Sequence, residues 1–269
     1  MIAPYYILSQ TRIDTPTAHP LRWRSVAVAT VLLTAWCMLY YHATRSTSDL
    51  WQAIYRNQGL PDGFEIRGID VSHYQGDINW ERVSHTKVMD SPISFAIMKA
   101  TEGVSIVDDH FITNFRESRR HGMIRGAYHF FTPDEPASSQ AAHFIRRVRL
   151  EKDDLPPVLD IETIGNLSGE ELHDAVLTFL LLVEDYYGAK PILYTNLNFK
   201  QRYLNSPDFE SYPFWIAHYY VKNVGWQGEW HFWQHTDRGR LPGIQTLVDF
   251  DVFNGSMYAL KQLCVKSNN

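Results

Sequence analysis

Eight short apolar runs, separated by polar turns and helical segments, occupy the sequence after residue 65. Strands that alternate with helices favour a parallel sheet, because a parallel pair needs a long crossover connection. Eight such strands within about 200 residues predict an α/β fold, a modified (β/α)8 TIM-like barrel in a single domain. The predicted strands are Ile66–Val71, Phe95–Ala100, Ile124–Phe131, Val158–Ile161, Pro191–Thr195, Phe214–Ala217, Phe232–His235 and Leu247–Asp251.

Helical segments follow the first four strands and become short or missing in the second half of the chain. The long amphipathic segment that ends at Tyr187 begins with a capping box, in which Ser168 and Glu171 have the required spacing. The predicted helices are Trp80–Val88, Asp109–His121, Ala137–Leu150 and Ser168–Tyr187.

Polar and aromatic residues gather where the predicted strands end, whereas the opposite ends are mostly Pro, Gly or aliphatic. Barrel enzymes build their active sites from the carboxyl ends of the strands, so these side chains should share one cleft. Carboxylates, amides and aromatic walls suit a neutral substrate rich in hydroxyl groups. The candidate residues are Asp70, Lys99, Glu102, Tyr128, Asp160, Glu162, Tyr194, Asn196, Trp215, Trp233, Gln234 and Asp249.

The fourth strand ends in two carboxylates, Asp160 and Glu162, on either side of Ile161. Residues i and i+2 of a strand face the same way, with Cβ atoms roughly 6.5 Å apart. Repulsion and lost hydration would raise at least one pKa, as a general acid near neutral pH requires. A D-x-E sequence alone is more often a solvated pair before a loop. The companions at the other strand ends favour catalysis.

The charge and the cysteine content argue against several classes of function and of site. Residues 50–269 carry 21 Lys and Arg against 28 Asp and Glu, a net charge of −7, which argues against nucleic-acid binding. Cys37 and Cys264 lie at opposite ends, so neither a disulfide scaffold nor a cysteine metal site is expected. No histidine spacing typical of metal ligands occurs, and we predict no metal and no cofactor.

An uncharged run, residues 26–41, follows Arg22 and Arg24 near the N-terminus. With its flanking residues it approaches the ~20 residues that span a bilayer. The arginines favour a cytoplasmic N-terminus. We therefore expect a cytoplasmic tail (1–24), a transmembrane signal anchor (25–43), a linker (44–65) and a periplasmic catalytic barrel (66–265), as a single-pass inner-membrane protein. A cleaved signal peptide and a core helix remain alternatives, although the run lacks a small-x-small cleavage site.

Eight motifs in order resemble the glycosyl hydrolase family 25 muramidases, the Chalaropsis-type lysozymes, over residues 66–260. Together they make the resemblance specific, although each is weak alone. The membrane-anchored form without wall-binding repeats looks like enterobacterial members. The motifs begin at Gly68 (GIDVSHYQG), Phe95 (FAIMKATEG), Gly126 (GAYHF), Pro157 (PVLDIE), Pro191 (PILYTN), Trp215 (WIAHY), Phe232 (FWQH) and Val248 (VDFDVFNG).

The resemblance implies hydrolysis of the β-1,4 bond between N-acetylmuramic acid and N-acetylglucosamine in peptidoglycan. It assigns Glu162 as general acid/base and Asp160 as the group that assists the substrate's 2-acetamido group. Asp70 and Asp249 would shape charge in the cleft, and Asp251 competes with Asp249 for its role. The expected substrate-binding residues are Tyr128, Tyr194, Asn196, Trp215, Trp233, Gln234, Lys99 and Glu102, with Lys99 and Glu102 possible as a supporting ion pair.

The expected partners are peptidoglycan glycan strands and the inner membrane, and we expect a monomer. Because Asp160 and Glu162 approach from one side, substrate assistance by the acetamide is favoured over a covalent intermediate. One alternative is a chitinase-like hydrolase, although Leu155-Pro156-Pro157 does not supply the acids of the longer chitinase signature. The other is a non-catalytic glycan-binding protein of the envelope.

Overall fold

The structure is a computed structural model that describes residues 32–36, 40, 61–88 and 90–266. The chain divides into two compact units, residues 1–57 and 58–269. In the first unit residues 32–36 are helical, and the rings of Trp36 and Tyr40 stack with centroids 5.6 Å apart. Among the residues that the structure describes, no helix is long and apolar enough to cross a membrane. Most of the predicted anchor lies outside the described residues.

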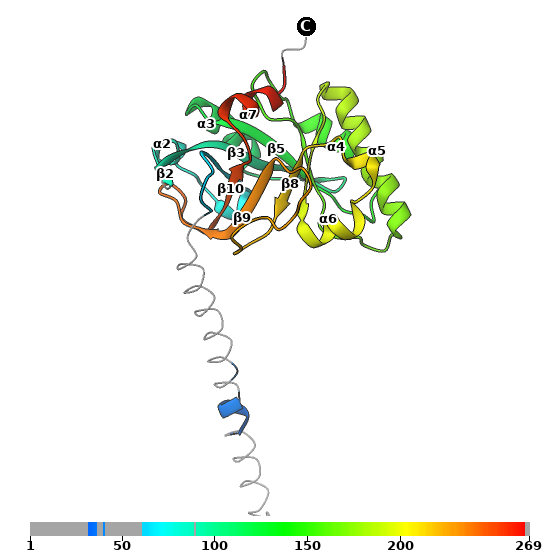
Figure 1. Cartoon of the computed structure of the whole chain (residues 1–269), viewed down its shortest axis with the longest axis horizontal. Coiled ribbons are helices and arrows are strands. Elements are labelled where there is room, and N and C mark those ends of the chain that lie inside the picture. The colour runs from blue at the N-terminus through cyan, green and yellow to red at the C-terminus, as the bar shows by residue number, and fades with distance from the viewer. Residues whose placement is uncertain (1–31, 37–39, 41–60, 89, 267–269) are drawn as a thin grey trace, which may run out of the picture. The chain divides into compact units, whose positions relative to one another are not determined.

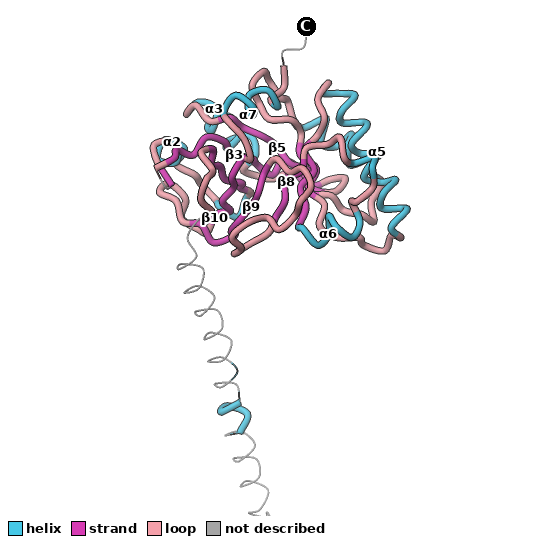
Figure 2. The backbone as a smooth tube through the Cα atoms, in the orientation of Figure 1, coloured by secondary structure: helices cyan, strands magenta, loops and turns pink. Residues whose placement is uncertain are grey.

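Eight strands of the second unit close into a barrel, as the sequence predicts (Figure 2). The ring closes because β1 pairs with both β3 and β10. Two short strands, β2 (Lys87–Val88) and β4 (Ile106–Val107), pair with β3 outside the ring. In ring order the strands are β1 (Ile66–Val71), β3 (Ser91–Glu102), β5 (Ile124–Phe130), β6 (Val158–Asp160), β7 (Ile192–Asn196), β8 (Phe214–Ala217), β9 (Phe232–Gly239) and β10 (Val248–Phe253).

The last strand departs from the predicted all-parallel barrel. β10 runs antiparallel to both of its neighbours, β9 and β1. The connection from Gly239 to Val248 contains no helix, and it is too short for the crossover that a parallel pair needs. Asp249 therefore reaches the mouth of the barrel from the beginning of its strand, and Asp251 lies deeper.

The helices are long in the first half and degenerate in the second, as expected. The helices α4 and α5 pack together on one side of the barrel (Figure 1). The capping box of Ser168 and Glu171 at the start of α5 is confirmed. The segment predicted as Trp80–Val88 is helical only to Ser84, because β2 follows. The remaining elements are η1 (His73–Gln75), α2 (Trp80–Ser84), α3 (Phe111–Arg120), α4 (Ala137–Arg147), α5 (Gly169–Tyr187), α6 (Leu197–Tyr203), η2 (Pro207–Phe209) and α7 (Met257–Leu263).

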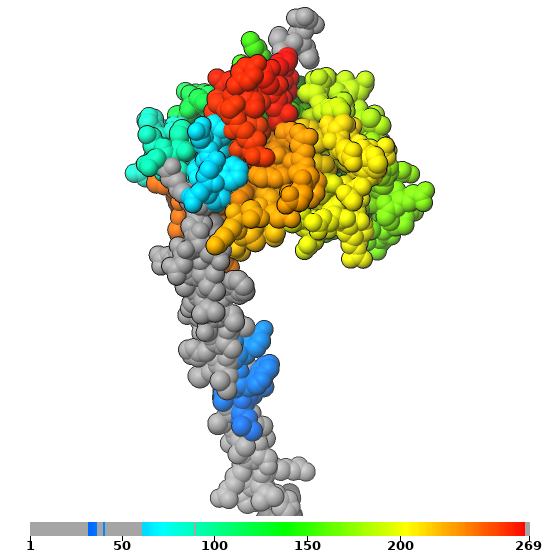
Figure 3. Space-filling view, in the orientation of Figure 1, coloured from blue at the N-terminus to red at the C-terminus, as the bar shows by residue number. Residues whose placement is uncertain are grey.

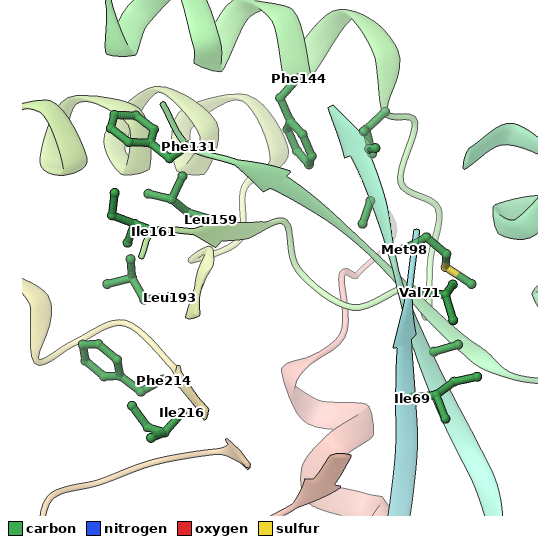
Figure 4. Packing of buried hydrophobic residues seen from close by; sticks show 14 of the residues in the cluster. Ile69, Val71, Met98, Phe131, Phe144, Leu159, Ile161, Leu193, Phe214 and Ile216 are labelled. Atoms are coloured by element: carbon green, nitrogen blue, oxygen red, sulfur yellow. The ribbon is translucent and has the colours of Figure 1, made fainter. Parts of the chain in front are cut away.

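Two hydrophobic cores lie on opposite faces of the strands. The outer core packs strand residues such as Leu159 and Ile161 against Phe144 of α4 and the aromatic residues near it (Figure 4). The inner core fills the barrel with Phe95, Phe232 and other large side chains. Because side chains alternate along a strand, each outward residue of the first core sends its neighbour into the barrel.

The inner core closes the end of the barrel opposite the mouth. Leu260 and Cys264, at the end of the chain, pack against residues at the starts of the parallel strands. Because β1 pairs with β10, the beginning and the end of this unit lie side by side on the surface (Figure 3). Gly68 is required beside this core, because a Cβ there would lie 2.2 Å from the ring of Phe95. The inner core thus fills the barrel at the end opposite the mouth.

Candidate active site

A cavity of about 220 Å³ opens at the barrel mouth, at the carboxyl ends of the parallel strands. Side chains from all eight strands of the ring, and from the turns next to them, form its walls. The resulting cleft is strongly polar, with acidic residues and aromatic rings combined. Its lining is Asp70, Val71, Ser72, Tyr74, Gln75, Lys99, Tyr128, Phe130, Asp160, Glu162, Tyr194, Trp215, Tyr219, Gln234 and Asp249.

Asp160 and Glu162 point into this cavity together, as the alternation predicts. Leu159 and Ile161 are fully buried in the outer core, which leaves the two carboxyls on the inner face. Asp160 is only 7% exposed, whereas Glu162 is open to the cleft. The two side chains are hydrogen-bonded to each other. The last residue of β6 and the segment just after it thus present a buried acid and an accessible acid as a coupled pair.

Burial raises the pKa of Asp160 well above its ordinary value, and the charge of Glu162 adds to this. Burial by the cleft walls also raises the pKa of Glu162, while the hydrogen bond to Asp160 and the charge of Lys99 oppose the rise. Two interacting carboxyls titrate as a unit, so the pair keeps a proton to higher pH than an exposed carboxyl would. A raised pKa at the cleft surface is the direction that general acid catalysis requires.

A second acidic group lies where β1 meets β10. Asp70 is hydrogen-bonded to both Asp249 and Asp251. Burial raises the pKa of Asp249 to about 9, and Asp70 adds to the shift. Asp251 is 1% exposed and accepts a 2.9 Å hydrogen bond from Nε1 of Trp215. The structure thus assigns the cleft position to Asp249 and places Asp251 beneath it.

Gln234 connects this acidic group to the aromatic wall. Its Nε2 donates a 2.6 Å hydrogen bond to Oδ2 of Asp70. Its Oε1 accepts hydrogen bonds of 2.6 Å from the hydroxyls of Tyr194 and Tyr219. All polar atoms of the Gln234 amide group thus serve to hold neighbouring cleft residues, so its role in the absence of substrate is to position them.

Lys99 places a positive charge beside the carboxyl pair. Its Nζ lies 2.5 Å from Oε2 of Glu102 and 4.8 Å from the centre of the Phe130 ring. The predicted ion pair between Lys99 and Glu102 is present. Glu102 is not among the cavity-lining residues, so it contributes through Lys99.

The cleft continues beyond Glu162 into a second cavity of about 350 Å³. Glu162, Tyr194 and Tyr219 line both cavities, so the carboxyl pair lies where they join. The predicted binding residue Asn196 lines the second cavity, but its Oδ1 accepts the N–H of Phe199 to cap α6. The cap uses only the side-chain oxygen of Asn196, so its side-chain nitrogen can still donate a hydrogen bond to a ligand. An extended polymer can therefore lie across the mouth with units on both sides of Glu162.

Comparison with known proteins identifies the family. Residues 69–244 match the glycosyl hydrolases family 25. The chain belongs to this family. It is 43% identical to the Escherichia coli K12 protein YegX over 203 residues, 75% of this chain and 74% of YegX. It is 34% identical to Lysozyme M1 of Streptomyces globisporus over 225 residues, 77% of this chain and 74% of that protein.

Solved structures of the family agree with the fold. The crystal structure of the bacterial lysozyme from Streptomyces coelicolor has a TM-score of 0.68 and 32% identity, and the match covers 76% of this chain and 98% of that one. The protein is therefore a glycosidase of the lysozyme-containing family 25.

Membership of family 25 does not by itself assign roles to individual residues, so these are judged from their positions in the cleft. Asp70, Asp160, Glu162 and Asp249 meet at the mouth. The same cavity is lined by five of the predicted substrate-binding residues, Tyr128, Tyr194, Trp215, Gln234 and Lys99. Among the described part of the chain, no group of three or more His, Cys, Asp or Glu side chains could hold a metal ion.

Trp233 is the predicted binding residue that the structure removes from the cleft. It is fully buried in the outer core, and its Nε1 donates a 2.8 Å hydrogen bond to the carbonyl oxygen of His218. Because Gln234 faces the cleft, its neighbour Trp233 must face outward. Because side chains alternate between the two faces of β9, the sequence alone indicates that Trp233 and Gln234 cannot both face the cleft.

Three aromatic residues of the cleft, Tyr74, Phe130 and Tyr219, were absent from the predicted site. Tyr219 follows β8 in the motif that begins at Trp215, and its place two residues after Ala217 was a usable signal. Tyr74 belongs to the turn after β1 and is 73% exposed. No periodic pattern indicates the direction of a side chain in such a turn, so only the structure reveals it.

Proposed function

We propose that the protein is an N-acetylmuramidase that cleaves the β-1,4 bond between N-acetylmuramic acid and N-acetylglucosamine in peptidoglycan. The observation that carries the proposal is the Asp160–Glu162 pair, with an accessible acid hydrogen-bonded to a buried one in an open cleft. The similarity to Lysozyme M1 supports the choice of substrate.

Glu162 acts as the general acid and base in this proposal. Its proton passes to the glycosidic oxygen as the bond to the anomeric carbon breaks, and the leaving sugar departs with a hydroxyl group. Glu162 then accepts a proton from the water that attacks the anomeric carbon. Burial raises the pKa of Glu162, which is the direction that this role requires.

Asp160 is suited to hold the substrate's 2-acetamido group. Its Oδ1 is buried and has no hydrogen-bond partner among the described residues. A buried acceptor without a partner is unfavourable, and an amide N–H from the substrate would satisfy it. That contact would direct the acetamide oxygen toward the anomeric carbon, where it forms a cyclic oxazolinium intermediate that water then opens.

The geometry of the pair supports substrate assistance over a covalent enzyme intermediate. Retaining glycosidases that form one usually hold their two carboxyls about 5–5.5 Å apart, on either side of the sugar. Asp160 ends β6, and Glu162 follows two residues later and is hydrogen-bonded to it, so the two carboxyls approach from the same side. A covalent adduct on Asp160 after incubation with a 2-deoxy-2-fluoro glycoside would contradict this mechanism.

The experiment is hydrolysis of purified peptidoglycan, followed by turbidity and by reducing-end analysis after borohydride reduction. The native protein should release chains that end in reduced muramic acid, and Glu162→Gln should be slower by roughly 10²–10⁴-fold. The matched control is Glu170→Gln, an exposed residue at the start of α5. Cleavage of chitin oligosaccharides but not peptidoglycan would favour the chitinase-like alternative. Binding without cleavage by either would favour the glycan-binding one.

We also propose that residues 25–43 anchor the enzyme in the inner membrane, with the barrel in the periplasm. The support is the uncharged run of residues 26–41 with arginines before it. The full chain should remain with membranes after alkaline carbonate extraction, and added protease should digest the barrel in spheroplasts. Recovery of the barrel in the soluble fraction would contradict the anchor.

A further inference from the structure

Tyr74 is the most exposed aromatic side chain at the catalytic cleft. It is 73% exposed and lines the cavity that contains Asp160 and Glu162. The other cavity tyrosines differ from it. Tyr194 is 6% exposed, and its hydroxyl and that of Tyr219 are bound to Gln234. Tyr74 has no hydrogen-bond partner for its hydroxyl among the described residues. No hydrogen bond of this side chain within the protein therefore explains why a tyrosine stands exposed at the cleft.

The backbone beneath Tyr74 is held firmly. Residues 73–75 form the 3-10 turn η1, with a capping box between Ser72 and Gln75. Nε2 of Gln75 donates a 2.9 Å hydrogen bond to the carbonyl oxygen of Leu247, which joins the turn to the loop before β10. Oγ1 of Thr246 donates to the carbonyl oxygen of Tyr74 at 3.4 Å. The ring therefore stands on a turn that is fixed from two parts of the chain.

One face of the Tyr74 ring is already covered. The ring of His73 lies against it, with centroids 4.1 Å apart and an angle of 36° between the planes. Asp108 holds His73 in place, because its Oδ2 accepts the backbone N–H at 2.8 Å and lies 3.0 Å from Nδ1. Asp108 is itself buried. A rigid aromatic pair thus presents a single free face at the edge of the cleft.

The position of Tyr74 complements the second cavity. Asn196, Asn198 and His218 line that cavity on the β7–β8 side of Glu162. Tyr74 lies on the β1 side, with Ser72 and Gln75, and does not line the second cavity. A glycan chain that crosses the carboxyl pair would therefore meet amide groups on one side and a flat ring on the other.

We infer that Tyr74 is a stacking platform for a sugar ring of the glycan chain, in a subsite on the β1 side of the carboxyl pair. A rigid ring loses little conformational entropy on binding, and its apolar face matches the C–H face of a pyranose. The inference rests on the proposed function for the identity of the polymer. It adds a binding site that the catalytic residues do not include.

The test compares the full-length protein with Tyr74→Ala and Tyr74→Phe. The substrates are alternating N-acetylglucosamine–N-acetylmuramic acid tetrasaccharides, hexasaccharides and octasaccharides. Tyr74→Ala should raise KM roughly three- to tenfold for the longest chains, the range expected for one ring contact, with kcat nearly unchanged. Tyr74→Phe keeps the ring and should match the native protein. The effect should shrink as the chain is shortened.

The matched control is Tyr258→Ala. Tyr258 is also 73% exposed, but it belongs to α7 at the closed end of the barrel. It should leave KM and kcat unchanged. A loss in kcat for Tyr74→Ala, an effect independent of chain length, or an equal effect of Tyr258→Ala would overturn the platform.

Direct binding separates this inference from the proposed function. Dissociation constants of the octasaccharide for Glu162→Gln and Glu162→Gln/Tyr74→Ala are measured by calorimetry, which does not depend on hydrolysis. Weaker binding by the double variant supports the platform even if the native protein cleaves nothing. Equal binding, or no binding by Glu162→Gln, overturns it. Absence of cleavage with a Tyr74-dependent affinity would instead refute only the proposed function.

Discussion

The side-chain amide of Gln234 lies 2.6 Å from the carboxylate of Asp70, although the two residues are 164 positions apart in the chain. This hydrogen bond connects β9 to β1, the two strands on either side of β10. It joins the acidic group of the mouth to the tyrosine wall, because Gln234 also accepts from Tyr194 and Tyr219. One neutral side chain thus fixes the relative positions of three cleft residues.

Gln234→Met should therefore damage both stability and activity. Methionine has a similar volume but leaves Asp70 and two tyrosine hydroxyls without their partner. We expect the free energy of unfolding to fall by about 1–3 kcal/mol and peptidoglycan hydrolysis to slow. Urea denaturation and initial rates measure the two effects. Gln262→Met, on the exposed surface of α7, should change neither. Native-like stability of Gln234→Met would show that the hydrogen bonds contribute nothing.

Lys99→Met should move the pH–rate profile upward. The charge of Lys99 lowers the pKa of both Asp160 and Glu162, so its removal lets the pair keep its proton to higher pH. We expect both limbs of the kcat/KM profile to shift up by as much as about one pH unit. Lys99→Arg keeps the charge and serves as the control. A downward shift would be inconsistent with the position of Lys99 beside the pair.

Stability should fall between pH 7 and pH 9. Burial raises the pKa of Asp249 from an ordinary value of 3.8 to about 9, and it also raises the pKa values of Asp70 and Asp251. The folded state binds more protons than the unfolded state in this range, so the free energy of unfolding decreases as pH rises. We expect a lower Tm at pH 9 than at pH 7.

The choice of pH range separates these carboxyls from the buried histidines. Burial lowers the pKa of His129 to about 4 and that of His235 to about 3, from 6.5. These histidines make the free energy of unfolding rise with pH, the opposite of the carboxyls. Their effect no longer changes above the pKa of an unfolded histidine, so it is nearly constant from pH 7 upward. Asp251→Asn removes one carboxyl and should reduce the difference in Tm between pH 7 and pH 9. An unchanged difference would refute the role of the acidic group, and calorimetry measures it directly.

Gly68→Ala should destabilise the barrel by about 1–3 kcal/mol. The added Cβ would lie 2.2 Å from the Phe95 ring, which fills the barrel interior and cannot move outward. Gly169→Ala is the matched control, because no atom lies within 4 Å of its added Cβ and the residue opens α5. It should be neutral or stabilising. The double variant Gly68→Ala/Phe95→Leu should recover part of the loss in urea denaturation, and no recovery would exclude this contact as the cause.

Much of the site could be predicted from local patterns. The sequence around Leu159 and Ile161 indicates a strand with these residues on one face, and the structure buries both in the outer core. Asp160 and Glu162 are therefore directed into the barrel whatever the rest of the chain does. The same reasoning was available for β9, where Gln234 inside requires Trp233 outside, and the strand-end argument alone led to the wrong prediction for Trp233.

Local sequence by itself determined the order of strands and helices, the capping box of α5, and the direction of the side chains along each strand. These features depend on interactions between residues a few positions apart, which the periodicity of the sequence records. Only the tertiary structure decided the antiparallel direction of β10, the bridge from Gln234 to Asp70, and the support of Tyr74 by Thr246 and Leu247. These relationships form when the ring of strands closes, because closure brings together residues that no local pattern connects.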